Sequence, residues 1–348
     1  MAGTTSIEWT EKSWNPIAGC KILSKGCRQC YAMGIAGRLE AMRTVPHYQG
    51  LTEKVNGRFV WSGKIGVAGW KTWLEPLRWT KPAKIFVNSM SDLGYEGVSD
   101  EIIYRALAVM ALSCQEPHRA TTLGWTWRRR HIFQILTKRP ARLVPIINNL
   151  AQYSRRRSDS DLEIHPFSKA VFEVSDQLPS KFARQGLSIA WSWVQFGFPG
   201  LWLGTSVEDE HTARVRLPVL LYAAAPVLWV SVEPMLGQIR LTNLQTDDRL
   251  QKIDALRGNA IVFGRTRPLS RGLNWVVVGG ESGNGARPMN PDWVRSLRDE
   301  CRAADVPFFF KQWGHFNARG VAVGKNKAGR VLDGRTWNQE PVESEPIE

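Results

Sequence analysis

The stretch Val227–Pro234, VLWVSVEP, decides the fold class of this chain. Apolar residues fill almost every position up to Val232, after which a carboxylate and a proline end the run. A short, continuous apolar run is typical of a strand that is buried on both faces, as in a parallel sheet. Comparable runs recur at Ser6–Trp9, Lys84–Val87, His131–Leu136, Leu201–Leu203, Asn274–Val278 and Pro307–Phe310.

Helical patterns separate these runs. Asp100–Cys114 carries apolar residues at helical spacing behind a candidate N-cap, Ser99, and Asp292–Ala303 follows Asn290 and a proline at the first helical position. Strands that alternate with helices predict an α/β fold with parallel strands, and we expect a partial or complete (β/α) barrel. An open doubly wound sheet is the alternative. Further helical patterns lie at Thr212–Ala224 and Pro140–Tyr153.

The barrel is expected to occupy residues 1–314, and residues 315–348 are expected to form a C-terminal extension. Two charged segments without clear periodicity, near 155–187 and 246–272, have the character of insertions. The extension ends in EPVESEPIE, an acidic segment whose composition is typical of disorder.

The composition is that of a globular protein with a basic surface. The chain has 348 residues, of which 43% are hydrophobic, and no apolar run is long enough to predict a transmembrane helix. The start, MAGTTSIEWTEKSWNP, lacks the basic and apolar regions of a secretory signal, so we expect a cytoplasmic location and no membrane partner. The net charge of +14, from 46 basic and 32 acidic residues, favours a polyanionic partner such as nucleic acid.

Three of the five cysteines lie close together in Gly19–Ala32, GCKILSKGCRQCYA. In a reducing compartment, clustered cysteines are typical of metal or cluster sites rather than disulfides. Three thiolates on a four-iron cluster leave one iron open for an exogenous ligand. A structural zinc site with a fourth ligand such as His47 is the alternative. The other two cysteines, Cys114 and Cys301, lie on apolar helical stripes and are expected to be core thiols.

Polar residues follow nearly every predicted strand. In parallel barrels and sheets, sites form at the carboxyl ends of the strands, so these residues are expected to converge on one site. They are Asn88, Ser89, Ser91 and Asp92 after the second strand, Lys138 and Arg139 after the third, Ser206 and Glu208 after the fourth, Glu233 after the fifth, and Gly279, Gly280 and Glu281 after the sixth.

The loop with Cys20, Cys27 and Cys30 resembles that of the radical S-adenosylmethionine (SAM) enzymes, in which three cysteines follow the first barrel strand. Its spacing, C-x6-C-x2-C, is three residues longer than the usual C-x3-C-x2-C. The runs WNPIAGC, GCRQCYA, FVNSMSDL, ILTKRP, GTSVED, SVEPMLG, VVGGESG, ARPM, FFFKQWG and LDGRTW are similar, in this order, to a phage- and prophage-associated, radical-SAM-like family whose substrate is unassigned.

This resemblance implies a [4Fe–4S] cluster on the three cysteines, with SAM on the open iron. An external electron donor would reduce the cluster, which cleaves SAM to a 5′-deoxyadenosyl radical. For a phage-encoded chain, the location would be the host cytoplasm.

The resemblance also implies roles by position. Asn88, Ser89, Ser91 and Asp92 would contact the SAM amino group, and Ser206 and Glu208 its ribose or carboxylate. Arg139 would pair with the SAM carboxylate or a substrate phosphate, and Gly279 and Gly280 would let the backbone approach SAM. Lys138, Glu233 and Glu281 are the candidate catalytic residues, for substrate hydrogen bonding or proton transfer.

The sequence therefore predicts a radical SAM enzyme that acts on a nucleic acid or modified nucleotide, in phage DNA modification or repair. One alternative is a zinc-binding, nucleic-acid-binding protein without catalysis. Another is a cluster-free hydrolase that uses Glu208, Glu233 and Glu281. No catalytic Ser-His-Asp arrangement, P-loop or dinucleotide fingerprint is present.

Overall fold

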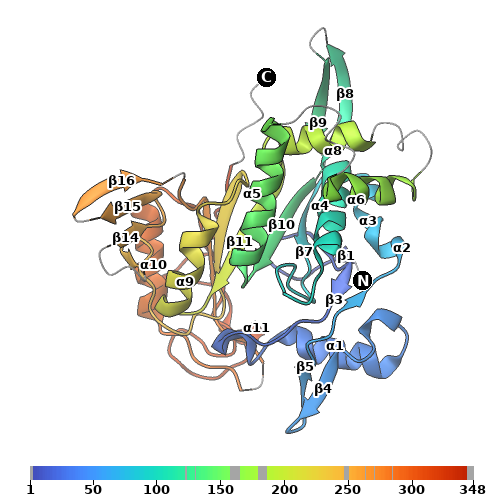
Figure 1. The fold of residues 1–348 in the computed structure, drawn as a ribbon. Helices are drawn as coiled ribbons and strands as arrows, with labels where there is room; N and C mark the ends of the chain where they lie inside the picture. Colours follow the sequence, from blue (N-terminus) through green and yellow to red (C-terminus); the bar gives the residue numbers. More distant parts are fainter. Residues whose placement is uncertain are drawn as a thin grey trace.

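A curled parallel sheet forms the centre of the computed structural model, which describes residues 3–342 except 122–123, 130, 157–164, 179–185, 247–250, 263, 270 and 284. Seven parallel strands follow one another in chain order and form a half-barrel (Figure 1). They are β2 (Lys12–Trp14), β7 (Ala83–Val87), β10 (His131–Thr137), β11 (Leu201–Val207), β12 (Val227–Val232), β17 (Trp275–Gly279) and β18 (Phe308–Gln312). The short β1 (Gly3–Thr4) pairs with β2 in the antiparallel sense.

The strands are buried on both faces, as their sequences predict. One face carries a cluster of aromatic side chains, in which Trp229 packs against Trp9 and Trp275. In β11, Gly204 stands beside Trp229, and a side chain at that position would overlap the indole ring. The other face packs its aliphatic residues, such as Val230 and Val276, against the helices in the main core.

Helices cover the outer face of the sheet. They are α4 (Asp100–Cys114), α5 (Pro140–Arg156), α6 (Pro166–Ser175), α8 (Gly186–Gln195), α9 (Glu210–Leu220) and α10 (Pro291–Ala303). The bounds of α4 are those predicted, and α10 begins at Pro291 behind Asn290, whose side chain accepts a hydrogen bond from the Asp292 N–H. A capping box of Asp209 and Thr212 fixes the start of α9 directly after β11.

The first predicted strand is wrong. Ser6–Trp9 forms no strand; Trp9 lies in a turn, and its ring belongs to the aromatic cluster. The first parallel strand is β2, which ends one residue before Asn15. The fourth strand is longer than predicted, so Ser206 lies inside β11 rather than after it.

The two expected insertions contain regular structure in their described parts. The segment near 155–187 contributes α6, whose buried residues join the main core beside α4. The segment near 246–272 contributes most of a separate four-stranded antiparallel sheet. Its strands are β13 (Leu244–Gln245), β14 (Gln251–Asp254), β15 (Asn259–Val262) and β16 (Arg265–Pro268).

The C-terminal extension packs against β18 through the stretch around Trp337 and Gln339. Leu332 and Trp337 are buried, and Trp337 contacts Phe308 of β18 edge to face. The short helix α11 (Lys325–Ala328) lies in this segment. Residues 343–348, most of the acidic end expected to be disordered, lie outside the described part of the chain.

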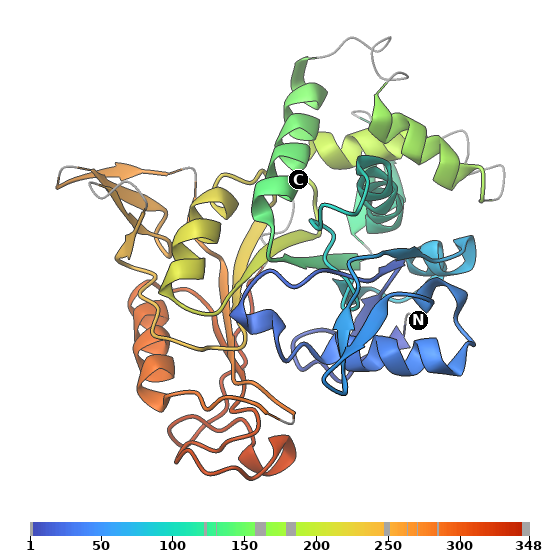
Figure 2. The same cartoon turned by 60° about the horizontal axis from the view of Figure 1, so that its bottom comes forward.

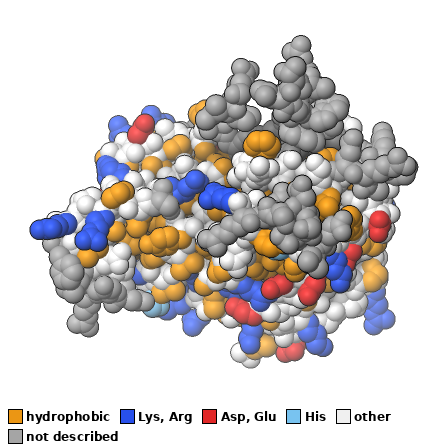
Figure 3. Space-filling view, turned by 45° about the horizontal axis from the view of Figure 1, so that its top comes forward, with side chains coloured by type: hydrophobic (Ala, Val, Ile, Leu, Met, Phe, Trp, Pro, Cys, Tyr) orange, Lys and Arg blue, Asp and Glu red, His pale blue; other side chains and the backbone are white. Residues whose placement is uncertain are grey.

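The N-terminal segments cover the carboxyl ends of the strands, which come forward in Figure 2. They are β3 (Ile17–Ala18), η1 (Lys25–Cys27), α1 (Tyr31–Met42), η2 (Pro46–Tyr48), β4 (Thr52–Val55), β5 (Arg58–Trp61) and β6 (Gly66–Val67). The short helices α2 (Trp70–Trp73) and α3 (Glu75–Arg78) follow, and the Pro76 carbonyl lies 3.1 Å from the ring of His131 at the amino end of β10. The hairpin of β8 (Gln115–Thr121) and β9 (Gly124–Arg129) lies at the opposite end. At that end, Figure 3 shows Lys, Arg and apolar side chains interspersed around residues drawn in grey.

No helix in the described part of the chain is long and apolar enough to cross a membrane.

Candidate functional site

A cavity of about 270 Å³ opens at the carboxyl ends of the strands. Its lining unites segments far apart in sequence and includes all but two of the predicted site residues. Those that line it are Cys20, Cys27, Cys30, Asn88, Ser89, Ser91, Asp92, Lys138, Arg139, Ser206, Glu233, Gly280 and Glu281. The exceptions are Glu208 and Gly279. The predicted convergence at the strand ends is therefore confirmed.

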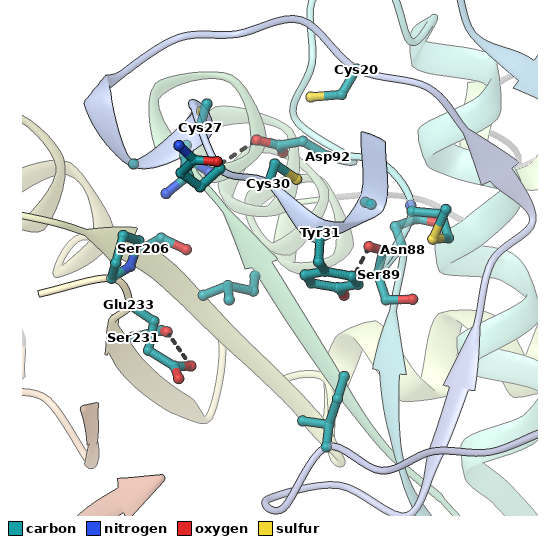
Figure 4. A pocket seen from close by; sticks show the side chains of 18 of the residues that line it. Cys20, Cys27, Cys30, Tyr31, Asn88, Ser89, Asp92, Ser206, Ser231 and Glu233 are labelled. Carbon is teal, nitrogen blue, oxygen red and sulfur yellow. Dashed lines mark hydrogen bonds between the residues drawn. The ribbon is translucent and has the colours of Figure 1, made fainter. Parts of the chain in front are cut away.

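The three cysteines of the loop line one end of this cavity, and none forms a disulfide (Figure 4). Burial and, to a lesser extent, nearby Asp92 raise the pKa of the Cys20 thiol to about 12, against the opposing charge of Arg139. Burial also raises the pKa of Cys30. Among the described residues, no three His, Cys, Asp or Glu side chains lie close enough together to hold one metal ion. His47 does not line the cavity, so its expected place beside the cysteines in a zinc site is not formed.

Glu208 lies behind the cysteine loop, fully buried, and both of its carboxylate oxygens are used. Oε1 accepts hydrogen bonds from Lys138 Nζ at 2.5 Å and from the Ser24 hydroxyl at 2.7 Å. Oε2 is 3.1 Å from Arg216 Nη1. A side chain on Gly26 would overlap Glu208, so glycine is needed for this close approach. Glu208 therefore anchors the loop rather than facing the cavity.

The charge state of Glu208 follows from these contacts. Burial alone would raise its pKa, but the ammonium of Lys138 and the guanidinium of Arg216 outweigh burial and lower it. The carboxylate is therefore ionised within a buried network of charged hydrogen bonds.

A second buried ion pair anchors the start of the loop. Arg139 Nη1 donates to Asp92 at 3.1 Å, and Nη2 donates to the Lys21 carbonyl at 3.0 Å. Its Nε donates to Glu96. Asp92 also accepts from the Thr137 hydroxyl and from a backbone N–H. Because every nitrogen of the guanidinium has a protein partner, this geometry favours a positioning role for Arg139 over the expected pairing with a ligand carboxylate.

A third ion pair lies at the other side of the cysteine loop, and the sequence did not predict it. Glu281 and Arg287 form a two-pronged pair, and Arg287 Nη2 also donates to the Lys25 carbonyl at 3.1 Å. Arg287 belongs to the run ARPM, so the family resemblance pointed to the segment but not to the side chain. Glu281 is thus paired rather than free.

Asn88 has unsatisfied polar atoms beside the cysteine loop. It follows β7 with a left-handed backbone (φ 59°) and is 3% exposed. Neither its amide nitrogen nor its amide oxygen has a hydrogen-bond partner among the described residues, and the same is true of the Ser91 hydroxyl. Buried polar groups are nearly always hydrogen-bonded, so these atoms indicate a place where a bound molecule completes the bonding.

The other end of the cavity holds a further charged pair. Lys311 Nζ lies 3.1 Å from Glu233 Oε1, and the Ser231 hydroxyl donates to Oε2. Gly279 does not line the cavity, but a side chain there would overlap the Glu233 carboxylate. Ser231 and Gln312, which stand at the ends of β12 and β18, also line the cavity.

Tyr31, directly after Cys30, lies between the two ends of the cavity (Figure 4). Its hydroxyl donates to the Ser89 carbonyl at 3.1 Å. Although Tyr31 as a whole is 55% exposed, desolvation of its hydroxyl and the neighbouring Cys30 raise its pKa. The cavity therefore brings together the three thiols, the unsatisfied polar atoms of Asn88 and Ser91, and, at its other end, the ion pair of Glu233 and Lys311.

A family model described as "Protein of unknown function (DUF5131)" matches residues 4–341. Neither the curated proteins nor the solved structures contain a match to the chain.

Proposed function

The chain belongs to the DUF5131 family, and we propose that it is a radical SAM enzyme that binds a [4Fe–4S] cluster through Cys20, Cys27 and Cys30. The observation that carries this proposal is the donor set. Three thiols without disulfide partners, and no fourth cysteine, line a cavity at the carboxyl ends of a parallel half-barrel. Cys114 and Cys301 are fully buried in the main core and do not line this cavity.

The chemistry of the donor set, rather than a preformed metal site, supports such a group. Three thiolates leave one coordination position open, and the unsatisfied polar atoms of Asn88 and Ser91 lie in the same cavity. When bound, the cluster supplies an electron for the cleavage of SAM and thereby for hydrogen abstraction from a substrate. An external reductant must provide that electron.

The chain's own residues would bind SAM, orient the substrate and shield both from water. The Asn88 amide and the Ser91 hydroxyl would hold the polar amino-acid end of SAM, since they lack other partners. Trp9, Phe86 and Leu136 give the cavity an apolar wall that excludes water. Glu233 and Lys311, at the far end, would orient the substrate and hold a proton at a carboxylate oxygen or at Nζ.

The proposed substrate is a nucleic acid or a modified nucleotide. The net charge of +14 supports it because a polyanion is attracted to such a surface. The hydrolase alternative has less support, because Glu208 does not line the cavity and Glu281 is held by Arg287 in a two-pronged ion pair.

The test is anaerobic reconstitution of the full chain with iron and sulfide, followed by addition of dithionite and SAM. We expect a brown, reducible chromophore, about four irons per chain, and release of 5′-deoxyadenosine. Cys27→Ala should lose the chromophore. Cys301→Ala, which removes a buried thiol elsewhere, should keep it. A colourless wild-type protein, or one that holds a single zinc ion, would refute the proposal.

A further inference from the structure

The cysteine loop has an exposed apolar tip. Ile22 and Leu23, which lie between Cys20 and Cys27, are 40% and 49% exposed. Lys21 and Lys25 flank them and are also exposed. Single exposed apolar residues are ordinary, but here two consecutive ones stand between two cations beside an open cavity. We call Lys21–Lys25 the loop tip.

The loop tip is fixed at both of its ends. Arg139 holds the Lys21 carbonyl at 3.0 Å, and Arg287 holds the Lys25 carbonyl at 3.1 Å. The Ser24 hydroxyl is held by the buried Glu208 at 2.7 Å. Each holding side chain is itself in an ion pair, so the anchors resist displacement. Ile22 and Leu23 have no polar group to satisfy and are presented to solvent on a rigid base.

Two further cations belong to or contact the part of the cysteine loop that follows the loop tip. Arg28 follows it in the chain and is exposed, and Arg58 of β5 lies within 3.5 Å of Gln29, a residue of the cavity lining. This combination matches the chemistry of a nucleic acid, in which phosphates attract cations and stacked bases accept apolar side chains between them. An acidic protein surface would satisfy the cations but would not explain an exposed apolar pair next to Lys21, which lines the cavity.

We propose that the loop tip is a wedge that inserts Ile22 and Leu23 between the stacked bases of a nucleic acid, with Lys21 and Lys25 on the adjacent phosphates. The displaced base would enter the cavity, whose aromatic and polar lining suits a flat, hydrogen-bonding ring. The inference rests on the proposed nucleic-acid substrate and names how that substrate reaches the cysteines. It also gives the loop's additional length a role.

The test uses the full chain without cluster and a duplex DNA oligonucleotide that contains 2-aminopurine, whose fluorescence rises when it leaves the stack. Single-stranded DNA and an RNA hairpin with the same probe distinguish the kinds of nucleic acid. We expect wild type to raise the fluorescence of at least one stacked probe. The double variant Ile22→Ser/Leu23→Ser should reduce the rise about fivefold while it changes Kd less than about threefold.

Matched variants separate the contribution of the apolar side chains to the proposed wedge from that of the lysines. Val215→Ala, at an equally exposed apolar position outside the cavity lining, should behave as wild type. Lys21→Gln/Lys25→Gln should weaken binding and reduce the slope of log K against log salt by about two, one per phosphate. Thermal melting checks that each variant is folded.

Two results would overturn the wedge: an unchanged fluorescence rise in the Ile22/Leu23 variant, or no rise with any probe. These failures are distinct from failure of the proposed function, because SAM cleavage by the reconstituted protein is measured without nucleic acid. An active SAM-cleaving protein that binds no nucleic acid would refute the wedge and the proposed substrate, but not the radical chemistry.

Discussion

At the scale of single residues, Glu208 shows how a buried charge fixes a loop. The carboxylate has no contact with water, and it joins Ser24 of the cysteine loop to Lys138 after β10 and Arg216 of α9. A buried charge is tolerable only when it is paired and hydrogen-bonded, as this one is. Removing the charge should therefore affect both the stability of the fold and the order of the loop.

We predict that Glu208→Gln lowers the free energy of unfolding by about 3 kcal/mol, because Lys138 and Arg216 keep charges that nothing compensates. Chemical denaturation measures the loss. The Cys27 thiol, 3.8 Å from the Ser24 hydroxyl, should react faster with an alkylating reagent. Glu173→Gln, which breaks a surface pair with Arg105, should cost less than about 1 kcal/mol and leave Cys27 unchanged. Equal losses in both variants would contradict this role.

The ion pairs of Glu208 with Lys138 and Arg216 also predict that the stability of the fold depends on pH. The pKa of Glu208 is lower in the folded chain than its ordinary value of 4.5, so its ionised form stabilises the fold above that pH. The stability difference between wild type and Glu208→Gln should be full at neutral pH and shrink as pH falls below 4.5 through the folded pKa. Denaturation at a series of pH values measures it; a difference that grows toward acid would refute the sign.

A substitution of Gly26 tests the contact between the cysteine loop and Glu208 from the side of the loop. A methyl group at this position would overlap the Glu208 side chain, so Gly26→Ala should displace the loop and destabilise the fold by about 1–3 kcal/mol. Gly34→Ala in α1 is the control, since open space surrounds that position and alanine favours a helix. If both variants have wild-type melting temperatures, the close approach is not required.

At the scale of elements, the neighbouring strands β11 and β12 complement each other in side-chain size. Trp229 of β12 occupies the space that Gly204 of β11 leaves open, and the indole continues into the cluster with Trp9, Trp202 and Trp275. Protein interiors are close-packed, so the large ring and the missing side chain depend on each other. This pairing sets the shape of the aromatic face on which the cavity rests.

Gly204→Ala should therefore destabilise the fold by about 1–3 kcal/mol through overpacking. The combination with Trp229→Phe, which gives a smaller ring, should recover part of that loss, and a double-mutant cycle by chemical denaturation measures the coupling. Strict additivity of the two changes would show that the two side chains do not compete for space.

At the scale of the whole molecule, the C-terminal extension completes the sheet's edge. Trp337 packs on Phe308, its carbonyl accepts from the Phe310 N–H, and the Gln339 carbonyl accepts from Trp275 Nε1. The extension also contacts α10, because its Asp333 forms an ion pair with Arg298 of that helix. The extension is part of the folded unit, because it buries aromatic surface that the last strand would otherwise expose.

We expect Trp337→Ala to cost about 3–5 kcal/mol, as for other large buried aromatic residues. Val342→Ala, at a position that is 95% exposed, should change nothing. Thermal unfolding of both variants is the measurement. A Trp337→Ala protein as stable as wild type would show that the extension is a separate appendage.

The sequence by itself determined the alternation of strands and helices, the helix starts at Asp100 and Pro291, and the convergence of the strand-end residues. These follow from local patterns, since apolar runs and capping residues act on neighbouring positions, and parallel strands place their carboxyl ends together. Only the tertiary structure decided that Ser6–Trp9 is no strand, because the burial of Trp9 comes from Trp229 and Trp275, far along the chain.

The roles of individual site residues also depended on tertiary contacts. Glu208 follows a strand as the cavity residues do, but its contact with Ser24, 184 positions away, turns it into an anchor of the loop. Arg287 carries no local signal, and its pairing with Glu281 and the Lys25 carbonyl arises only when distant segments meet. Local propensity gives the elements, whereas the partner of a charged side chain is set by the fold that brings the two together.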